Sequence, residues 1–234
     1  MTRLQHNYQT VSQQVQQATQ QAARAPNSVQ LIAVSKTFPA DDIRQVYTAG
    51  ARHFGENYIQ EWYDKTNALA DLNDVVWHII GDVQSNKTKY VAERAAWVHT
   101  ISRLKIAQRL NDQRPDNLPP LQVCIEVNIA GEANKHGVAP QEALALAQAV
   151  AQLPKLKVRG LMCVAKADSN DNELRQQFHT MQQLLNELNQ AGIAADVLSM
   201  GMSADMNIAI QCGATHVRVG SAIFGKRDYP HHQE

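Results

Sequence analysis

Residues 31–37 read LIAVSKT, and the interpretation of the whole chain starts from this stretch. Four apolar residues, Leu31 to Val34, are followed by three polar ones that include Lys36. A short continuous apolar run of this kind predicts a strand buried on both faces, as in a parallel sheet. The sequence therefore places a lysine at the end of a buried strand.

Seven further runs of the same kind follow, and a helical or turn-like stretch comes after each one. They are 51–57, 75–81, 97–101, 121–129, 157–164, 195–200 and 215–220. Residues 4–24 carry apolar side chains at helical spacing, which predicts one more helix before the first strand. Eight such units in 234 residues predict an α/β fold, a single (β/α)8 TIM barrel with an extra N-terminal helix. An open doubly wound sheet is the alternative and accommodates eight units less naturally.

The chain shows no internal boundary in its composition. No Gly-, Ser- or Pro-rich linker and no low-complexity tail divides it. We therefore expect one domain over residues 1–234, with the N-terminal helix within 1–28 and the barrel over 29–229. The chain is 44% hydrophobic, which is enough for a core of this size.

Charge and hydropathy exclude several classes of function. Lysine and arginine total 22 and aspartate and glutamate total 22, so nothing global favours nucleic acid or an anionic membrane. No apolar run approaches the ~20 residues that a membrane helix needs. The N-terminus is polar and glutamine-rich, unlike a signal peptide. We expect a cytoplasmic protein.

The three cysteines predict neither a disulfide framework nor a metal site. Cys124, Cys163 and Cys212 are odd in number and have no C-x-x-C spacing. Buried free thiols in a reducing compartment are the simplest interpretation.

Polar residues gather where the predicted strands end, which is where TIM barrels carry their active sites. They are Lys36, Asn57, His78 with Gly81, Asn128, Ser203, and the group Arg218, Gly220 and Ser221. Among them His78 has a second interpretation, as an interior histidine satisfied by hydrogen bonds.

Lys36 and the last two loops suggest a ligand with two functional groups. A lysine held against apolar walls loses its charge readily and can form a Schiff base with an aldehyde, although its ammonium could also extend to solvent. The loops LSMGMSAD and RVGSAIFG offer backbone N–H groups suited to a phosphate, despite the anion Asp205. Pyridoxal 5′-phosphate (PLP) carries both an aldehyde and a phosphate, and so does a phosphosugar bound by a lysine aldolase.

Eight blocks, in chain order, resemble the pyridoxal phosphate homeostasis protein family. They are AVSKT, HFGENY, WHIIG with QSNK, VHTI, EVNI, RGLM, LSMGMSADM and VRVGSAIFG, over about residues 30–229. Members of this family are barrels similar to the alanine racemase N-terminal domain, which is called fold-type III. The resemblance implies a protein that holds PLP and acts as a carrier or buffer in intracellular PLP (vitamin B6) homeostasis, without catalysis of its own.

The resemblance also implies roles for particular residues. Lys36 corresponds to the lysine that forms the covalent aldimine, and Asn57 to the residue beside the cofactor ring. Arg218 corresponds to the arginine that faces the pyridine nitrogen, where it keeps that nitrogen unprotonated and weakens the ring as an electron sink. Ser203, Gly220 and Ser221 correspond to the phosphate cup.

The chain departs from the family pattern at several points. Ser221 stands where threonine is usual, and it keeps the hydroxyl. Asp82-Val83 replaces Pro-Leu, His136 replaces a serine, and the loop 165–172 lacks the usual prolines. These last three lie in predicted rim loops, so we expect them to affect partners or release.

Two other functions stay open at this level. A PLP-dependent racemase or decarboxylase is the first, although racemases of this fold add a β-rich second domain and need an acid opposite the lysine. A Schiff-base aldolase is the second, with Lys166 as the other candidate lysine, but we expect Lys166 on the solvated face. The carrier hypothesis predicts transient contact with PLP-dependent apoenzymes and a monomer.

Overall fold

The structure is a computed structural model that describes residues 1–227. Eight parallel strands close into one barrel, and each pairs with its neighbours in chain order, with β8 returning to β1. The alternative of an open sheet is therefore wrong, and the predicted closed (β/α)8 barrel is confirmed. The predicted end of the barrel at residue 229 lies outside the described residues.

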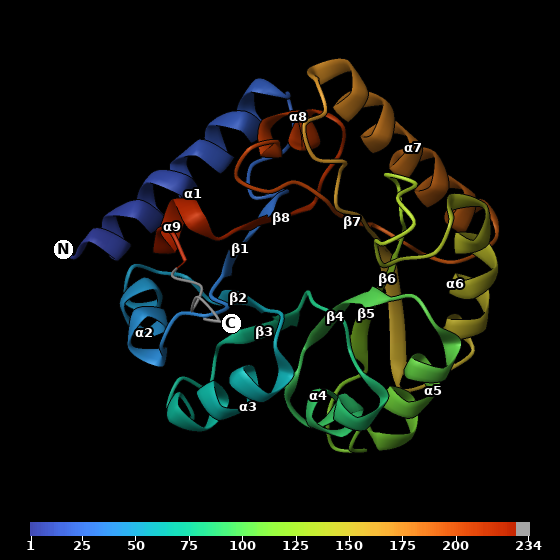
Figure 1. The fold of residues 1–234 in the computed structure, drawn as a ribbon, viewed down its shortest axis with the longest axis horizontal. Helices are drawn as coiled ribbons and strands as arrows, with labels where there is room; N and C mark the ends of the chain where they lie inside the picture. Colours follow the sequence, from blue (N-terminus) through green and yellow to red (C-terminus); the bar gives the residue numbers. More distant parts are fainter. Residues whose placement is uncertain (228–234) are drawn as a thin grey trace, which may run out of the picture.

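The strands are short and surround the barrel axis (Figure 1). They are β1 Gln30–Val34, β2 His53–Glu56, β3 Val76–Ile79, β4 Trp97–Ile101, β5 Leu121–Glu126, β6 Leu156–Met162, β7 Val197–Ser199 and β8 His216–Val219. Most are a few residues shorter than the apolar runs that predict them. As a result Lys36 and Asn57 lie just beyond their strands, in the loops of the barrel mouth.

The helices form an outer ring around the strands, as Figure 1 shows. They are α1 Arg3–Gln21, α2 Ala40–Thr48, α3 Ile59–Ala68, α4 Thr88–Arg94, α5 Leu104–Gln113, α6 Ala143–Ala151, α7 Asp171–Gln190, α8 Met206–Gln211 and α9 Ser221–Phe224, with the 3-10 turns η1 Ser85–Lys87 and η2 Pro140–Glu142. Within residues 1–227 no helix combines the length and hydropathy needed to cross a bilayer.

Helix α1 is the predicted extra helix, and it packs on the outside of the barrel against α2, α8 and α9. Thr2 and Gln5 form a reciprocal capping box at its start, which satisfies backbone donors that a helix end leaves open. Leu4, Val11 and Val15 are buried on its inner side. The helix therefore lies on the side of the barrel where β8 meets β1.

The main core lies between the strands and the helices. The strand residues that face outward are almost all fully buried, and so are their helical partners such as Ile43, Trp62 and Phe178. All three cysteines are buried and free, as expected. Burial of this kind on both faces explains why the strands are continuously apolar in sequence.

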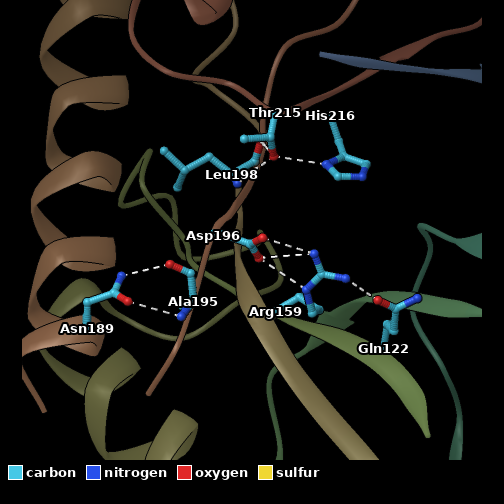
Figure 2. Close-up of polar contacts among 8 residues, drawn as sticks. All are labelled: Gln122, Arg159, Asn189, Ala195, Asp196, Leu198, Thr215 and His216. Atoms are coloured by element: carbon cyan, nitrogen blue, oxygen red, sulfur yellow. Dashed lines mark hydrogen bonds and ion pairs between the residues drawn. The ribbon is translucent and has the colours of Figure 1, made fainter. Parts of the chain in front are cut away.

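The N-terminal ends of β5 to β8 carry a group of paired polar side chains, drawn in Figure 2. The Arg159 guanidinium donates to the Asp196 carboxylate at 3.1 Å and also to the Gln122 side chain. Nearby, the Thr215 hydroxyl pairs with the His216 ring at 2.9 Å. This face of a TIM barrel usually serves stability rather than ligand binding.

Candidate functional site

A cavity of about 720 Å³ opens at the C-terminal ends of the strands. All six residues that the sequence predicts for the ligand site line it: Lys36, Asn57, Ser203, Arg218, Gly220 and Ser221. The remaining lining is formed by Val34, Ile80, Met162, Val164, Met202, Ala204, Lys226 and Arg227. Residues from both ends of the chain thus meet in one cavity, because β8 pairs with β1.

Two of the polar residues expected at the mouth lie elsewhere. His78 is fully buried inside the barrel and is hydrogen-bonded to two other histidines, as its second interpretation expects. Asn128 lines a separate cavity of about 210 Å³ beside Glu126 and His136. Lys166, the alternative lysine, is exposed, as expected.

Lys36 lies in a tight turn directly after β1. The Phe38 N–H donates to the Ser35 carbonyl at 3.1 Å, which closes the turn around Lys36 and Thr37. Thr37 has φ of 70°, a left-handed conformation that β-branched residues rarely adopt. The side chain of Lys36 is half-buried in the lining of the cavity. The turn therefore sends a single lysine into the mouth at the cost of backbone strain.

Asn57 follows β2 and offers an unsatisfied acceptor. Its side-chain oxygen is buried and has no hydrogen-bond partner among residues 1–227. The backbone of Asn57 runs so close to β3 that a Cβ on Gly81 would lie 2.6 Å from the Asn57 carbonyl oxygen. Glycine at position 81 is what allows this approach. A buried orphan acceptor beside a cavity is a group that a ligand donor can satisfy.

The loop after β7 resolves the objection raised by Asp205. The Asp205 carboxylate accepts a hydrogen bond from the Met202 N–H at 2.7 Å, so the anion closes its own loop. Ser203 stays exposed in the lining of the cavity. Asp205 is absent from the cavity lining, and its charge is used in shaping the loop.

The loop after β8 carries a positive charge that the sequence analysis missed. A Cβ built on Gly220 would lie 2.8 Å from a terminal guanidinium nitrogen of Arg227 and 3.3 Å from the Val34 carbonyl oxygen. Glycine therefore leaves room for Arg227 to cover the backbone next to Ser221. The Nε of Arg227 is buried and has no partner among residues 1–227. This arginine is suited to an anion held against Gly220 and Ser221.

Arg218 forms the floor of the cavity. It is 3% exposed, and its guanidinium donates to the Ser199 hydroxyl at 2.6 Å and to the Cys163 carbonyl at 2.9 Å. Burial lowers the pKa of Arg218 from its ordinary value, yet an arginine keeps its proton in proteins. Its acceptors are neutral, so its charge is not cancelled by a direct ion pair.

A line of hydrogen-bonded histidines extends from Ser199 through the barrel interior. His99 Nδ1 lies 2.8 Å from the Ser199 hydroxyl, His99 Nε2 lies 2.9 Å from His78 Nδ1, and His78 Nε2 lies 2.8 Å from His53 Nδ1. Burial, and the neighbouring histidines, hold the pKa of His78 and His99 well below the usual range. The histidines are therefore neutral. They pack in the barrel interior beneath Arg218 and are linked by hydrogen bonds.

The cavity lining is strongly cationic. Lys36, Arg218, Lys226 and Arg227 all contribute to it, and within residues 1–227 no aspartate or glutamate does. Low-dielectric walls such as Val34, Ile80 and Met162 strengthen the resulting field. This set of groups suits a small ligand that carries an anionic group and a carbonyl.

The groups that the sequence analysis missed left only weak signals. Lys226 and Arg227 directly follow the block VRVGSAIFG and stand close to its glycines. Their adjacency to a predicted phosphate loop was the available clue. A second cavity of about 620 Å³ lies between α1 and the start of β1, and its lining among the described residues includes no lysine and none of the six predicted site residues.

Comparison with known proteins assigns the fold to one class. The family model of the alanine racemase N-terminal domain matches residues 1–228. This places the chain in the class of the alanine racemase N-terminal domain.

Curated relatives and solved structures narrow the class. A pyridoxal phosphate homeostasis protein of Pseudomonas aeruginosa is 49% identical over 98% of each chain. A protein of unknown function from Bifidobacterium adolescentis is 29% identical with a TM-score of 0.89, covering 95% of this chain and 94% of that one. PipY of Synechococcus elongatus, solved with PLP bound, is 35% identical with a TM-score of 0.79, covering 90% of this chain and all of that one (100%). The chain belongs to the pyridoxal phosphate homeostasis protein family.

Proposed function

We propose that this protein binds PLP in the mouth cavity, holds it covalently through Lys36, and acts as a carrier or buffer in intracellular PLP homeostasis. When bound, PLP supplies an aldehyde for a lysine amine and a phosphate as an anchor. The observation that carries the proposal is the convergence of the six predicted residues on one cationic cavity. The Pseudomonas aeruginosa relative is named a pyridoxal phosphate homeostasis protein, and PipY has been solved with PLP.

The residues of the cavity divide the work between them. Ser203, Gly220 and Ser221 are proposed to hold the phosphate, with Arg227 lying over Gly220. Asn57 offers its orphan oxygen to a donor on the ligand ring. Arg218 presents a fixed positive charge from the floor toward the ring nitrogen, and this discourages a proton there. Lys36 reaches the aldehyde from the turn after β1.

The attachment is tested by borohydride trapping followed by peptide mapping. We expect one labelled peptide, which contains Lys36, in the native protein loaded with PLP. Lys36→Ala should give no trapped product and should keep weaker binding through the phosphate. The exposed Lys166→Ala is the matched control and should trap as the native protein does. A single trapped peptide in Lys36→Ala would show that another lysine is the attachment point.

We further propose that the protein does not catalyse amino-acid chemistry. A racemase needs a second proton donor or acceptor opposite the lysine. Over the described residues the cavity lining contains no Tyr, His, Cys, Asp or Glu. We would load the protein with PLP, add L- and D-amino acids in heavy water, and follow deuterium at the α-carbon by NMR. Exchange faster than free PLP produces for any amino acid would identify an enzyme.

We also propose that the protein is a monomer and transfers its bound PLP directly to PLP-dependent apoenzymes. Tyr58 and Met202 are large apolar side chains that stay 50% and 40% exposed, and each flanks a residue of the cavity. An apoenzyme mixed directly with loaded protein should gain activity faster than one separated from it by a dialysis membrane. Equal rates would indicate release into solution, and sedimentation of the loaded protein would reveal a dimer.

A further inference from the structure

A group of three charged side chains, two of them buried, lies directly behind the Lys36 turn. Lys65 on α3 is 7% exposed, and Glu56 at the end of β2 is fully buried. The Lys65 ammonium lies 2.7 Å from Glu56 Oε1 and 2.6 Å from Glu61 Oε1. Its third donor reaches the Ser35 carbonyl at 3.0 Å. All three protons of the ammonium thus have acceptors, which fixes its position.

The group forms hydrogen bonds with both chain neighbours of Lys36, namely Ser35 and Thr37. The Ser35 hydroxyl donates to Glu56 Oε1 at 2.8 Å, in addition to the bond that its carbonyl accepts from Lys65. On the other side, the Thr37 N–H donates to Glu61 Oε1 at 2.6 Å. The residue before Lys36 and the residue after it are therefore tied to the same three side chains.

The strained backbone at Thr37 shows that the group acts on the turn. A positive φ at the third residue of a turn is normally supplied by glycine, and a β-branched residue there is strained. Such strain persists only where neighbouring contacts impose it. The hydrogen bond from Thr37 to Glu61 is the contact that stabilises this conformation. A buried ion pair is itself weak evidence for stability, so another role is needed to explain it.

We propose that Glu56, Glu61 and Lys65 form an ionic clamp that positions the Lys36 amine in the cavity by holding Ser35 and Thr37. The three are positioning residues, since none of them lines the cavity. The inference rests on the proposed function, in which Lys36 is the attachment lysine. With the clamp intact, the turn presents the amine in one orientation, and without Glu61 the turn relaxes and the amine samples other directions.

Glu61→Ala is the variant of choice, because the Glu61 side chain is 31% exposed and its loss leaves the Glu56–Lys65 pair intact. In the protein without PLP, amide hydrogen exchange at Thr37 should speed up about 10-fold, as expected for the loss of one charge-assisted hydrogen bond. The rate of borohydride-trapped PLP attachment at Lys36 should fall about 10-fold. Glu61→Gln keeps a side-chain oxygen for the Thr37 N–H. It should restore much of the slow amide exchange at Thr37 and much of the PLP attachment rate at Lys36.

Asp64→Ala is the matched control, since Asp64 is an exposed carboxylate on the same helix that accepts a hydrogen bond from the Gln60 side chain. It should change neither Thr37 exchange nor the attachment rate. Unchanged attachment at Lys36 in Glu61→Ala would overturn the clamp while leaving the proposed function intact. If the native protein traps no PLP at Lys36, both proposals fail. Faster Thr37 exchange with an unchanged attachment rate would leave Glu61 as a purely structural contact.

Discussion

The two ends of the barrel treat charged side chains in different ways. At the lower end, where the strands begin, Arg159 pairs with Asp196 at 3.1 Å, and Lys155 pairs with Asp116 at 2.7 Å. At the mouth, four cationic side chains line one cavity without a carboxylate among the described lining residues. At the lower end each of these cations has a carboxylate partner, whereas the lining of the mouth cavity is cationic over the described residues and suits an anion. The difference separates residues that stabilise the barrel from residues that bind a ligand.

The largest effect on stability is expected from Arg114, a buried cation of the lower end. Its guanidinium donates to the carbonyls of Ala92, Ala95 and Pro119. Arg114→Met should lower the free energy of unfolding by about 4 kcal/mol, because several buried carbonyls lose their donors. Urea unfolding followed by circular dichroism measures this loss.

The same variant tests the separation of roles. PLP affinity of the folded Arg114→Met protein should stay within about twofold of the native value, since the site lies at the other end of the strands. A large loss of affinity would show that the two ends are coupled. Arg44→Met is the control, because the Arg44–Asp71 pair is exposed and its loss should hardly change stability.

At the mouth, removal of the ligand phosphate should have the next largest effect. Pyridoxal lacks the phosphate and should bind about 100-fold more weakly than PLP, which corresponds to about 2.7 kcal/mol. Arg227→Gln should lower the ratio of the PLP affinity to the pyridoxal affinity about 10-fold, because the guanidinium over Gly220 faces the proposed phosphate position. Fluorescence titration with both ligands measures the ratio.

Lys226→Gln is the matched control for Arg227. Lys226 also lines the cavity, but it is exposed, so water screens its charge and its loss should narrow the ratio less. Equal effects of the two variants would mean that the mouth attracts phosphate by its overall charge. An unchanged ratio in Arg227→Gln would remove Arg227 from the phosphate site.

The histidines of the barrel interior predict how stability depends on pH. Burial lowers the pKa of His216 to about 4 and holds those of His78 and His99 well below their usual range. The unfolded chain takes up protons below about pH 6.5 that the folded barrel excludes, so stability is lost as pH falls from 6.5. Above pH 6.5 these histidines are neutral in both states and add no pH dependence.

Glu56 opposes this trend over part of the range. Burial raises its pKa to about 7, with Lys65 and Ser35 acting in the other direction. The folded state therefore binds a proton that the unfolded state lacks between about pH 4.5 and 7, and this contribution weakens folding as pH rises. Together, the histidines and Glu56 should lower the free energy of unfolding by about 2 kcal/mol as the pH falls from 6.5 to 5.5.

Urea unfolding at several pH values measures this dependence. His99→Asn should make this loss of unfolding free energy smaller by about 1 kcal/mol, because asparagine takes up no proton when the chain unfolds. His179→Gln, at an exposed position on α7, should leave it unchanged. A steeper dependence in His99→Asn would contradict the assignment of His99 as a buried neutral group.

The sequence predicted the barrel because each strand is continuously apolar and is followed by a helix. It also predicted the mouth, since Lys36 and Asn57 stand at the ends of their runs and Arg218 lies in the last run, just before Gly220 and Ser221. The clamp escaped prediction because Glu56, Glu61 and Lys65 look like ordinary strand and helix charges until β2 and α3 are brought together. Arg227 escaped because its position over Gly220 depends on how the chain turns after α9. The features that could not be predicted from the sequence depend on contacts between elements, whereas the elements themselves could be predicted.

The smallest effect is expected at Asp196, and it tests whether pairing at the lower end contributes locally or as a network. The Asp196 side chain is 70% exposed, and Arg159 keeps Gln122 as an acceptor (Figure 2). The Arg159 guanidinium also lies 5.1 Å from the Trp97 ring centre. Asp196→Asn should therefore reduce the free energy of unfolding by no more than about 0.5 kcal/mol, with PLP attachment unchanged. A loss several times larger would mean that Arg159 depends on Asp196 to stay in place beneath the histidines. In that case the lower end would support the floor of the mouth through His216 and Trp97, and the two ends would act as one unit.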